Sequence, residues 1–394
     1  MVNCVLRQLA LSNFRSFLYT DVLFENPTIL VGRNGSGKSN FTDALAFLSE
    51  AMASPLQAVI ERRGGFSAVS HRSSARGRRG KLNLTVALEN PDERTESARY
   101  SIDLRPRSGS NFEVASEECS VVGNDGIRAW FVRRTSRGST RWKSSVESLR
   151  PVIEPRALAL PLVAGDRRFS AMFLFLASMR TYRIEPATLR AMQDPDGGVG
   201  LRSDGRNTAS VLREIHRRSS EQDWVRICEL IESVVPGTVE VRPKKHGNKL
   251  TLEFTQIREG TEPIKFEAFS MSDGTLRVLG LITAVFQRPI PSLLVIEEPE
   301  ASLHPRSLGV ILDVLRLASG SMQVVVTTHS PEVLDAKWIE DRHLRILTWE
   351  RGSSRISRVS QAVQTALCQR IMGAGELLRS NALTPEQPAD PNTP

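Results

Sequence analysis

The segment from Gly32 to Ser39 constrains this chain more than any other part of its sequence. It reads Gly-Arg-Asn-Gly-Ser-Gly-Lys-Ser and matches the phosphate-binding loop pattern G-x-x-x-x-G-K-[ST] in full. The apolar run at 28–31 predicts a buried strand before this loop, and residues 40–50 predict a helix after it. In that context, backbone N–H groups and a helix N-terminus converge on an anion. The segment therefore predicts an α/β fold that binds a nucleoside triphosphate.

Each position of the loop has an expected task. We expect Lys38 to reach the β- and γ-phosphates and the Ser39 hydroxyl to ligate Mg²⁺. The other expected nucleotide contacts in this region are Gly32, Asn34, Gly35, Ser36, Gly37 and Asn40. The alternative is a chance match in a Gly/Ser turn, which the flanking strand and helix make improbable.

A second segment, at 293–300, joins four apolar residues to a cluster of carboxylates. An apolar run without alternation is typical of a strand buried on both faces of a parallel sheet. Glu297 and Glu298 follow at its carboxyl end, where open α/β sheets bind ligands. We expect Glu297 to hold Mg²⁺ and Glu298 to activate the attacking water. Alone, such a cluster is more often a solvated turn, but its pairing with the phosphate-binding loop favours the catalytic interpretation.

Two more segments complete the pattern. The apolar strand predicted at 323–326 leads into Thr-Thr-His-Ser, so that His329 can reach a γ-phosphate. The turn Ser272-Asp273-Gly274 opens an apolar helix predicted at 278–286 and forms a second anion-binding helix N-terminus. This helix N-terminus has no strand of its own to serve. We therefore expect the turn to cap a nucleotide that is bound to another subunit.

These four elements, in this order, resemble the ABC-type ATPases, and most nearly the OLD/RecF-like (AAA_21-like) predicted ATPases related to SMC and RecF proteins. The strand Asn13-Phe14-Arg15-Ser16-Phe17 and the acidic box at 298–305 resemble the same group, as do patches at 180–186, 204–207 and 375–380. The resemblance covers nearly the whole chain, thinly between about 90 and 165. It implies a P-loop ABC-type ATPase core with an antiparallel β subdomain and a helical insertion.

The resemblance also implies roles for particular residues. Two protomers would sandwich two ATP molecules, each bound by one subunit's loop and by the signature Ser272-Asp273-Gly274 of the other. Glu298 would be the catalytic base, His329 the switch histidine and Arg15 a nucleotide contact. Ser302 and His304 would lie in a loop that crosses the dimer interface.

The chain departs from transporter ATPases at two positions. Asp273 stands in the signature where they usually carry glycine, and Glu297 stands where they carry aspartate, which argues against a transporter. The glutamine that such enzymes place near the metal has two candidates, Gln57 and Gln193, neither with motif support. The stretch after His329 is too short for the TOPRIM nuclease domain of many OLD-like proteins, so we expect no nuclease activity from this chain.

Composition describes an ordinary globular protein. Of 394 residues, 40% are hydrophobic and 24% charged, and no apolar stretch approaches the ~20 residues that span a bilayer. The N-terminus has no signal-peptide pattern, and four scattered cysteines suit a reducing compartment, so we expect a cytoplasmic protein with no membrane partner and with its cysteines in cores.

The net charge of +8 adds one hint about partners. Three predicted turns concentrate it: Arg72, Arg76, Arg78, Arg79 and Lys81; Arg133, Arg134, Arg137, Arg141 and Lys143; and Arg242, Lys244 and Lys245. If these turns share one face, they predict sequence-independent binding of double-stranded DNA through its phosphates. The alternative is a set of solvated hairpin tips with no ligand.

The expected organisation has five parts. An N-terminal part of the core (1–65) precedes an antiparallel β subdomain with basic turns (66–150) and a helical insertion with returning strands (151–268). The C-terminal part of the core (269–380) carries the signature, Glu297, Glu298 and His329, and a disordered tail (381–394) follows.

Three hypotheses for function remain. The first is a DNA-maintenance or phage-defence ATPase whose ATP-driven dimer closure clamps DNA. The second is an ATPase that scaffolds or regulates a separate effector, such as a nuclease or toxin, without binding DNA itself. The third, a transporter motor, is weakened by the signature and by the lack of membrane segments.

Overall fold

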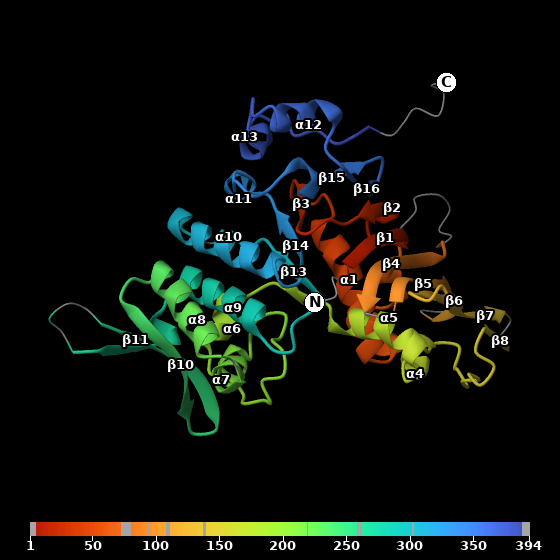
Figure 1. The fold of residues 1–394 in the computed structure, drawn as a ribbon, viewed down its shortest axis with the longest axis horizontal. Coiled ribbons are helices and arrows are strands. Elements are labelled where there is room, and N and C mark those ends of the chain that lie inside the picture. The colour runs from red at the N-terminus through yellow and green to blue at the C-terminus, as the bar shows by residue number, and fades with distance from the viewer. Residues whose placement is uncertain are drawn as a thin grey trace. The chain divides into compact units, whose positions relative to one another are not determined.

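The computed structural model describes residues 5–71, 80–92, 95–107, 111–136, 139–218, 220–257, 260, 262–301 and 303–387. Its contacts divide the chain into two units, whose helices and strands are labelled in Figure 1. Unit 1 consists of Met1–Met179 with Glu340–Pro394, and unit 2 is Arg180–Ile339. The acidic strand and His329 thus share a unit with most of the segment expected to be an insertion, whereas residues 340–380 return to the unit of the phosphate-binding loop.

In unit 1, the described strands form a seven-stranded antiparallel sheet in the order β2-β1-β4-β5-β6-β7-β8. Its strands are β1 (Val5–Phe14), β2 (Phe17–Leu23), β4 (Leu82–Asp92), β5 (Thr95–Pro106), β6 (Phe112–Gly123), β7 (Arg128–Ser136) and β8 (Ser139–Ser144). In β4, Leu82, Leu84, Val86 and Leu88 are all buried, as the alternating pattern predicts for a sheet with one covered face. The expected antiparallel subdomain is confirmed.

A second group of strands in unit 1 carries the phosphate-binding loop. In this group β15 (Leu344–Glu350) runs parallel to β3 (Thr28–Gly32) and antiparallel to β16 (Ser353–Ser357). The helices of unit 1 are α1 (Lys38–Ala53), α2 (Leu56–Arg62), α3 (Phe66–Val69), α4 (Leu160–Val163), α5 (Arg167–Ser178), α12 (Gln361–Cys368) and α13 (Ala374–Arg379). Helix α5 packs against α1 and against β4, β5 and β6, so it covers the apolar face of the sheet.

A buried ion pair lies in the core of that sheet. The Glu117 carboxylate accepts hydrogen bonds from the Tyr100 hydroxyl at 2.8 Å and from the backbone N–H groups of Ala159 and Leu160 at 2.6 and 2.8 Å. Arg133 lies 3.5 Å from this carboxylate, and both side chains are fully buried. Burial raises the pKa of Glu117. The prediction that Arg133 belongs to a basic turn is therefore wrong. The residue lies in strand β7, and its side chain is buried in the core.

Unit 2 combines a parallel sheet with helices. Strand β13 (Leu293–Glu297) runs parallel to β14 (Gln323–Thr328) and to β9 (Arg180–Tyr182), and both longer strands are buried along nearly their whole length. The helices of unit 2 are α6 (Pro186–Arg190), α7 (Thr208–Arg218), α8 (Glu221–Val234), α9 (Asp273–Phe286), α10 (Pro305–Ser319) and α11 (Pro331–Leu334). Strands β10 (Thr238–His246), β11 (Lys249–Gln256) and β12 (Ile264–Glu267) form a separate antiparallel sheet.

The chain beyond residue 380 is ordered in part. Backbone hydrogen bonds of 2.9 and 2.8 Å join Ser360 to Thr384 and Glu386 to Arg358, so these residues are held against the segment that follows β16. The expected disorder from 381 onward is therefore wrong up to residue 387, and 388–394 lie outside the described residues. Cys119 is buried as expected, whereas Cys368 is exposed. In the described parts, no helix is both long and apolar enough to span a membrane.

Candidate nucleotide-binding site

The phosphate-binding loop connects β3 to α1 with a backbone that requires glycine. Gly35 and Gly37 have φ of 79° and 110°, in the region that other residues rarely adopt. A Cβ on Gly37 would lie 2.3 Å from the Ser354 Oγ, so this position also lacks room for a side chain. Ser354 in turn hydrogen-bonds Ser16 through both backbone and side chain, at 2.8 Å each. The loop is thus packed against β16, a contact that no sequence motif predicts.

Two polar side chains of the loop are arranged as a phosphate site would need them. Lys38, only 5% exposed, donates from Nζ to the carbonyl oxygens of Gly32 at 2.8 Å and Arg33 at 3.3 Å. The Ser36 Oγ is buried without a hydrogen-bond partner, an exception to the usual pairing of buried polar atoms. Ser39 is exposed in the first turn of α1, where N–H groups are free to meet an anion. These residues fit the phosphates of a nucleotide.

Arg15, predicted as a nucleotide contact, is held by α1. Its Nε forms an ion pair with Asp43 at 2.6 Å, and Arg63 joins the same carboxylate at 3.0 Å. Arg63 also reaches Glu50 at 2.9 Å. Sequence patterns did not single out Asp43, Glu50 or Arg63, because no spacing rule links residues on separate elements.

In unit 2, the chain turns sharply where β13 ends. Glu297 pairs in register with Thr327 of β14, and the next residue, Glu298, has a left-handed φ of 43°. The Glu298 N–H donates to the Thr327 carbonyl oxygen at 3.0 Å. Such a conformation costs about 1–3 kcal/mol in a residue other than glycine, and it is found mainly at functional sites. Here it places two adjacent carboxylates beyond the same strand end.

The structure places His329 close to Glu298, and also close to Glu300, which was not among the predicted site residues. The His329 Nδ1 lies 3.5 Å from the Glu298 Oε1 and 3.6 Å from the Glu300 Oε1. That Glu300 oxygen also accepts hydrogen bonds from the Thr328 hydroxyl at 2.7 Å and from the His329 N–H at 3.1 Å. The other Glu300 oxygen is buried without a partner. Glu300 therefore positions the histidine. The acidic box in the sequence did not indicate this role for Glu300.

The signature turn forms a regular helix start. The Ser272 Oγ caps α9 by accepting from the Thr275 N–H at 3.2 Å, and both Ser272 and Asp273 are exposed. Asp273 is ion-paired with Arg190, which also donates to the Met271 carbonyl oxygen at 3.0 Å. An arginine next to the turn therefore compensates the aspartate that distinguishes this signature.

The two candidates for a glutamine near the metal, Gln193 and Gln57, form hydrogen bonds elsewhere. Gln193 is buried, and its Oε1 accepts from the Ala209 N–H at 2.8 Å near the start of α7. Gln57 donates to Glu61 at 2.8 Å on the surface of α2. Neither side chain contacts Glu297 or Ser39 among the described hydrogen bonds. Of the two residues expected at the dimer interface, Ser302 lies outside the described residues, and His304 is exposed just before α10.

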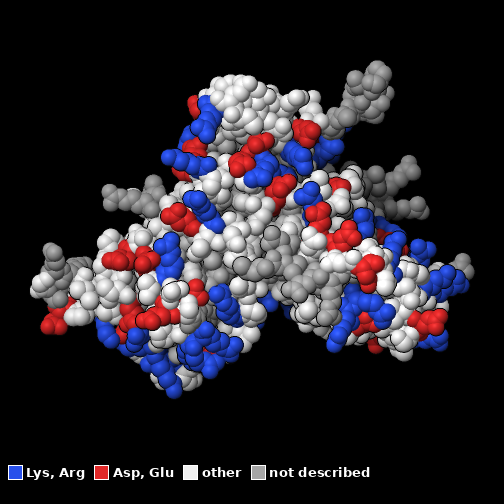
Figure 2. All heavy atoms as spheres, viewed as in Figure 1, with Lys and Arg blue, Asp and Glu red and all other residues white. Residues whose placement is uncertain are grey.

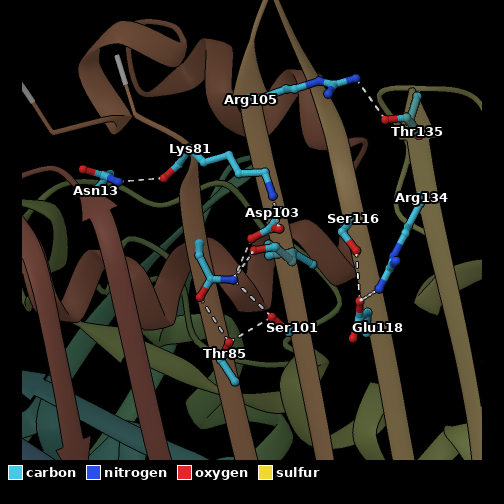
Figure 3. Close-up of polar contacts among 12 residues, drawn as sticks. Asn13, Lys81, Thr85, Ser101, Asp103, Arg105, Ser116, Glu118, Arg134 and Thr135 are labelled. Atoms are coloured by element: carbon cyan, nitrogen blue, oxygen red, sulfur yellow. Dashed lines mark hydrogen bonds and ion pairs between the residues drawn. The ribbon is translucent and has the colours of Figure 1, made fainter. Parts of the chain in front are cut away.

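Of the eight described basic residues that suggested a DNA footprint, five have acidic partners: Lys81, Arg133, Arg134, Arg242 and Lys244. Lys81 pairs with Asp103 at 2.6 Å and Arg134 with Glu118 at 3.5 Å, on the polar face of the seven-stranded sheet (Figure 3). In unit 2, Arg242 pairs with Glu240, and Lys244 lies 2.8 Å from both Glu253 and Glu267. Residues 72–79 and Arg137 lie outside the described parts. The remaining members, Arg141, Lys143 and Lys245, are exposed.

Surface charge in unit 2 is concentrated in one place. Lys and Arg side chains gather over α7 and the hairpin of β10 and β11, while basic and acidic side chains alternate elsewhere in this view (Figure 2). The last turn of α7 contributes His216, Arg217 and Arg218. This helix lies outside the three basic segments that the sequence predicted as a DNA footprint.

No group of three or more His, Cys, Asp or Glu side chains in the described residues could hold a metal by itself. Mg²⁺ commonly binds through one or two carboxylates together with substrate phosphates and waters. The Ser39 hydroxyl in unit 1 and the Glu297 carboxylate in unit 2 are ligands of the right kind for that mode. Unit 1 contains the phosphate-binding loop, and unit 2 contains the acidic strand, the histidine and the signature.

Comparison with proteins of known sequence finds relatives in bacteria and in a phage. The chain is 32% identical over 128 residues to the "DNA replication and repair protein RecF" of Clavibacter sepedonicus, covering 31% of each protein. It is 35% identical over 126 residues to the "Chromosome partition protein Smc" of Mycobacterium tuberculosis, covering 30% of this chain and 10% of Smc. It is 23% identical over 362 residues to the "Old nuclease" of Escherichia phage P2, covering 84% of this chain and 57% of the nuclease. The chain thus spans less than two thirds of each of these relatives.

Solved structures support the fold. An Smc head bound to the C-terminal winged-helix domain of ScpA matches with a TM-score of 0.54 at 15% identity, covering 91% of this chain and 99% of that one. The Smc head of Pyrococcus furiosus bound to the C-terminal domain of ScpA also matches with a TM-score of 0.54, at 14% identity, covering 93% and 99%. The predicted ABC-type ATPase fold is therefore confirmed.

A family model matches residues 28–119 and 125–335, which include the phosphate-binding loop, the signature, the acidic strand and His329. The family and the fold are those of ATPases. The chain belongs to the family described as "AAA domain, putative AbiEii toxin, Type IV TA system".

Proposed function

We propose that this protein binds and hydrolyses ATP with Mg²⁺, and that the phosphate-binding loop of unit 1 and the acidic strand of unit 2 serve the same nucleotide. The observation that carries the proposal is the loop itself. It has a glycine backbone with positive φ, a buried lysine held on loop carbonyls and a buried serine hydroxyl without a partner. Family membership supports hydrolysis as the outcome of binding.

Phosphoryl transfer depends mainly on positioning and on neutralising charge. Lys38 would leave its carbonyl partners to bind the β- and γ-phosphates, and Ser36 would donate its free hydroxyl to a phosphate oxygen. Ser39 and Glu297 would hold Mg²⁺, which supplies further positive charge when it is bound. Glu298 would orient the attacking water, and His329, held by Glu300, would contact the γ-phosphate.

We further propose that the active form is a homodimer closed by two ATP molecules. Ser272 and Asp273 are exposed at the start of α9, a helix of 14 residues that presents free N–H groups there. This arrangement suits a phosphate bound by the loop of a second copy. The ion pair of Asp273 with Arg190 supports this step, because it lowers the repulsion between an aspartate and an approaching phosphate.

For the cellular task, we propose DNA maintenance or phage defence through sequence-independent contact with double-stranded DNA. The printed names of the RecF and Smc relatives support this assignment. One observation favours a second candidate, in which the closed dimer scaffolds or regulates a separate effector such as a nuclease or toxin. Lys81, Arg134 and Lys244 are neutralised by carboxylates, and the family description itself mentions a toxin system.

Steady-state ATP hydrolysis, measured with and without linear duplex DNA at low and at physiological salt, tests these proposals, with Glu298→Gln as the blank. Stimulation by DNA that fades with added salt supports the DNA assignment, because phosphate contacts release counterions. Hydrolysis that is indifferent to DNA supports the effector assignment. Absence of hydrolysis above the Glu298→Gln blank in every condition would contradict the enzymatic proposal.

A pair of matched variants sharpens the DNA test. Arg141→Gln/Lys143→Gln removes two exposed charges of β8, whereas Lys81→Gln removes one that Asp103 already neutralises. Direct DNA binding predicts loss of stimulation in the first variant and little change in the second. Equal stimulation in both would exclude β8 as the contact.

A further inference from the structure

Away from the nucleotide site, unit 1 contains a cavity of about 420 Å³ that opens between two strands of different sheets. Strands β2 and β16 begin side by side, where Ser354 N–H donates to Ser16 O at 2.8 Å and Leu18 N–H donates to Ser353 Oγ at 2.9 Å. Farther along, residues of both strands line the cavity. Its lining consists of Tyr19–Leu23 from β2, Arg345 from β15, Arg355–Arg358 from β16 and its continuation, and Glu386 and Gln387.

The most unusual group in this lining is the guanidinium of Arg345. Although the residue is only 2% exposed, no carboxylate in the described structure forms an ion pair with it. Its Nε donates to the Leu23 carbonyl oxygen at 2.8 Å, and its Nη1 donates to those of Arg342 and Leu344 at 2.7 and 2.8 Å. Its Nη2, with two N–H groups, is buried and has no partner. Burial lowers the pKa of Arg345 to about 10, yet the group remains charged at neutral pH.

Charge around the cavity favours an anion. Buried charges are normally paired, and a guanidinium without a counterion is costly. Arg355 and Arg358 also line the cavity and are exposed. Arg355 has only a distant partner, Glu350, at 3.8 Å. Three arginines therefore line one space, and the most buried of them, Arg345, has an Nη2 group without a hydrogen-bond partner in the described structure.

The cavity also contains groups that suit the rest of a ligand. Two carboxylates, Asp21 and Glu386, line it as well, and Asp21 already accepts hydrogen bonds from Gln8 at 2.8 Å. Carboxylates are acceptors of hydrogen bonds and would repel a bare anion, but they bind hydroxyl groups well. Tyr19 and Leu23 add apolar surface. A volume of about 420 Å³ lies in the range of small-molecule sites and far exceeds the size of a phosphate ion.

We propose that this cavity binds a small phosphorylated molecule that also carries hydroxyl groups, with its phosphate on the free N–H groups of Arg345 and its hydroxyls on Asp21 and Glu386. Arg355 and Arg358 attract the phosphate at the mouth. The site is separate from the phosphate-binding loop, although both lie in unit 1 and both involve β16. Ser354 contacts the loop, and the residues that follow it in the same strand line the cavity.

Isothermal titration calorimetry with ribose 5-phosphate, inorganic phosphate and ribose tests the proposal on the full chain. We expect ribose 5-phosphate to bind more tightly than phosphate, and ribose not to bind. Arg345→Gln should weaken binding of ribose 5-phosphate about tenfold or more, as expected for loss of charged hydrogen bonds. Because that change could unfold the protein, Arg355→Gln/Arg358→Gln, which alters only exposed side chains, should weaken binding in the same direction.

Two controls keep the cavity distinct from the nucleotide site. Arg99→Gln/Arg128→Gln removes the same charge from exposed positions on β5 and β7 and should leave binding unchanged. Lys38→Ala, which disables the proposed ATP site, should also leave it unchanged. The proposal is overturned if ribose 5-phosphate does not bind, if Lys38→Ala abolishes its binding, or if the arginine variants at the cavity behave like the Arg99→Gln/Arg128→Gln control.

Discussion

At the scale of single residues, the phosphate-binding loop holds its charged groups in place before any nucleotide arrives. Lys38 rests on the carbonyl oxygens of Gly32 and Arg33, so binding exchanges neutral acceptors for charged phosphate oxygens. Charge-assisted hydrogen bonds are shorter and stronger than neutral ones, which makes the exchange favourable. In unit 2, Glu300 likewise holds a site residue in place, because its carboxylate accepts a hydrogen bond from the His329 N–H.

Replacing Lys38 by alanine should remove ATP turnover. The change deletes the buried loop lysine that we expect to neutralise the β- and γ-phosphates, so the hydrolysis rate should fall to the level of the Glu298→Gln blank. Release of inorganic phosphate at saturating ATP measures this. Lys143→Ala, at an exposed position of β8, is the matched control and should keep the basal rate. Normal hydrolysis by Lys38→Ala would show that the loop is not the site.

Glu300→Ala should slow hydrolysis while leaving ATP affinity nearly unchanged. It removes the acceptor for the Thr328 hydroxyl and the His329 N–H, so the histidine loses its orientation. Loss of hydrogen bonds to a charged group corresponds to a decrease of about tenfold or more in kcat. The comparison is Glu332→Ala, which removes a nearby carboxylate that binds Ser330 instead. A similar rate in both variants would mean that Glu300 has no positioning role.

At the scale of elements, the seven-stranded sheet is joined to the chain that leads into α4 by its buried ion pair. Glu117 binds the backbone N–H groups of Ala159 and Leu160, and Arg133 donates to the carbonyl oxygens of Glu154 and Ala157. The pair therefore satisfies backbone groups that a purely apolar core would leave unpaired. This function explains why two full charges occupy the core of a sheet.

Arg133→Met should destabilise the protein by about 3–5 kcal/mol, because it leaves Glu117 as a buried charge without its partner. Urea unfolding followed by circular dichroism measures the free energy change. The neighbouring Arg134→Met is the control, since Arg134 is 73% exposed and its pair with Glu118 should contribute at most about 1 kcal/mol. If both variants unfold at the same urea concentration, the buried pair is not a structural requirement.

At the scale of the whole molecule, we propose that the ATPase works as a pair of chains. Unit 1 provides the loop, unit 2 provides the acidic strand, and the exposed signature on α9 has no phosphate-binding loop in its own unit. A second copy would supply the loop that the signature faces. The proposed dimer therefore depends on ATP, and slower hydrolysis should prolong the lifetime of the dimer.

Glu298→Gln should accumulate as a dimer when ATP and Mg²⁺ are present and return to the unliganded state when nucleotide is removed. Sedimentation velocity at several protein concentrations measures the change. Adding Ser272→Arg to the same protein should retain ATP binding but prevent the shift, because the arginine fills space that the other subunit's phosphates need. If Glu298→Gln with ATP sediments as it does without nucleotide, the ATP-sandwiched dimer is wrong.

Local pattern was enough for much of this protein because its core segments are continuous in sequence. The strand, loop and helix around Lys38 lie within one stretch of chain, and so do the strand of Glu297 and the helix that follows it, α10. Apolar runs and alternation therefore predicted the strands and the class of fold. The same local signals could place Glu298 and His329 at strand ends, where neighbouring parallel strands bring them together.

Other features depend on contacts between distant segments, which no periodicity reveals. Arg133 was expected in a solvated turn, but the facing strand presents Glu117, and the chain at 154–160 covers both. Gln193 was a candidate near the metal, yet the start of α7 uses its amide oxygen. Arg345 lines a cavity together with residues of β2 and β16, which are far apart in the sequence. Composition and spacing determined the elements and the nucleotide chemistry, whereas burial and partner choice were decided by tertiary packing, because the energy of a charged side chain depends on which distant groups surround it.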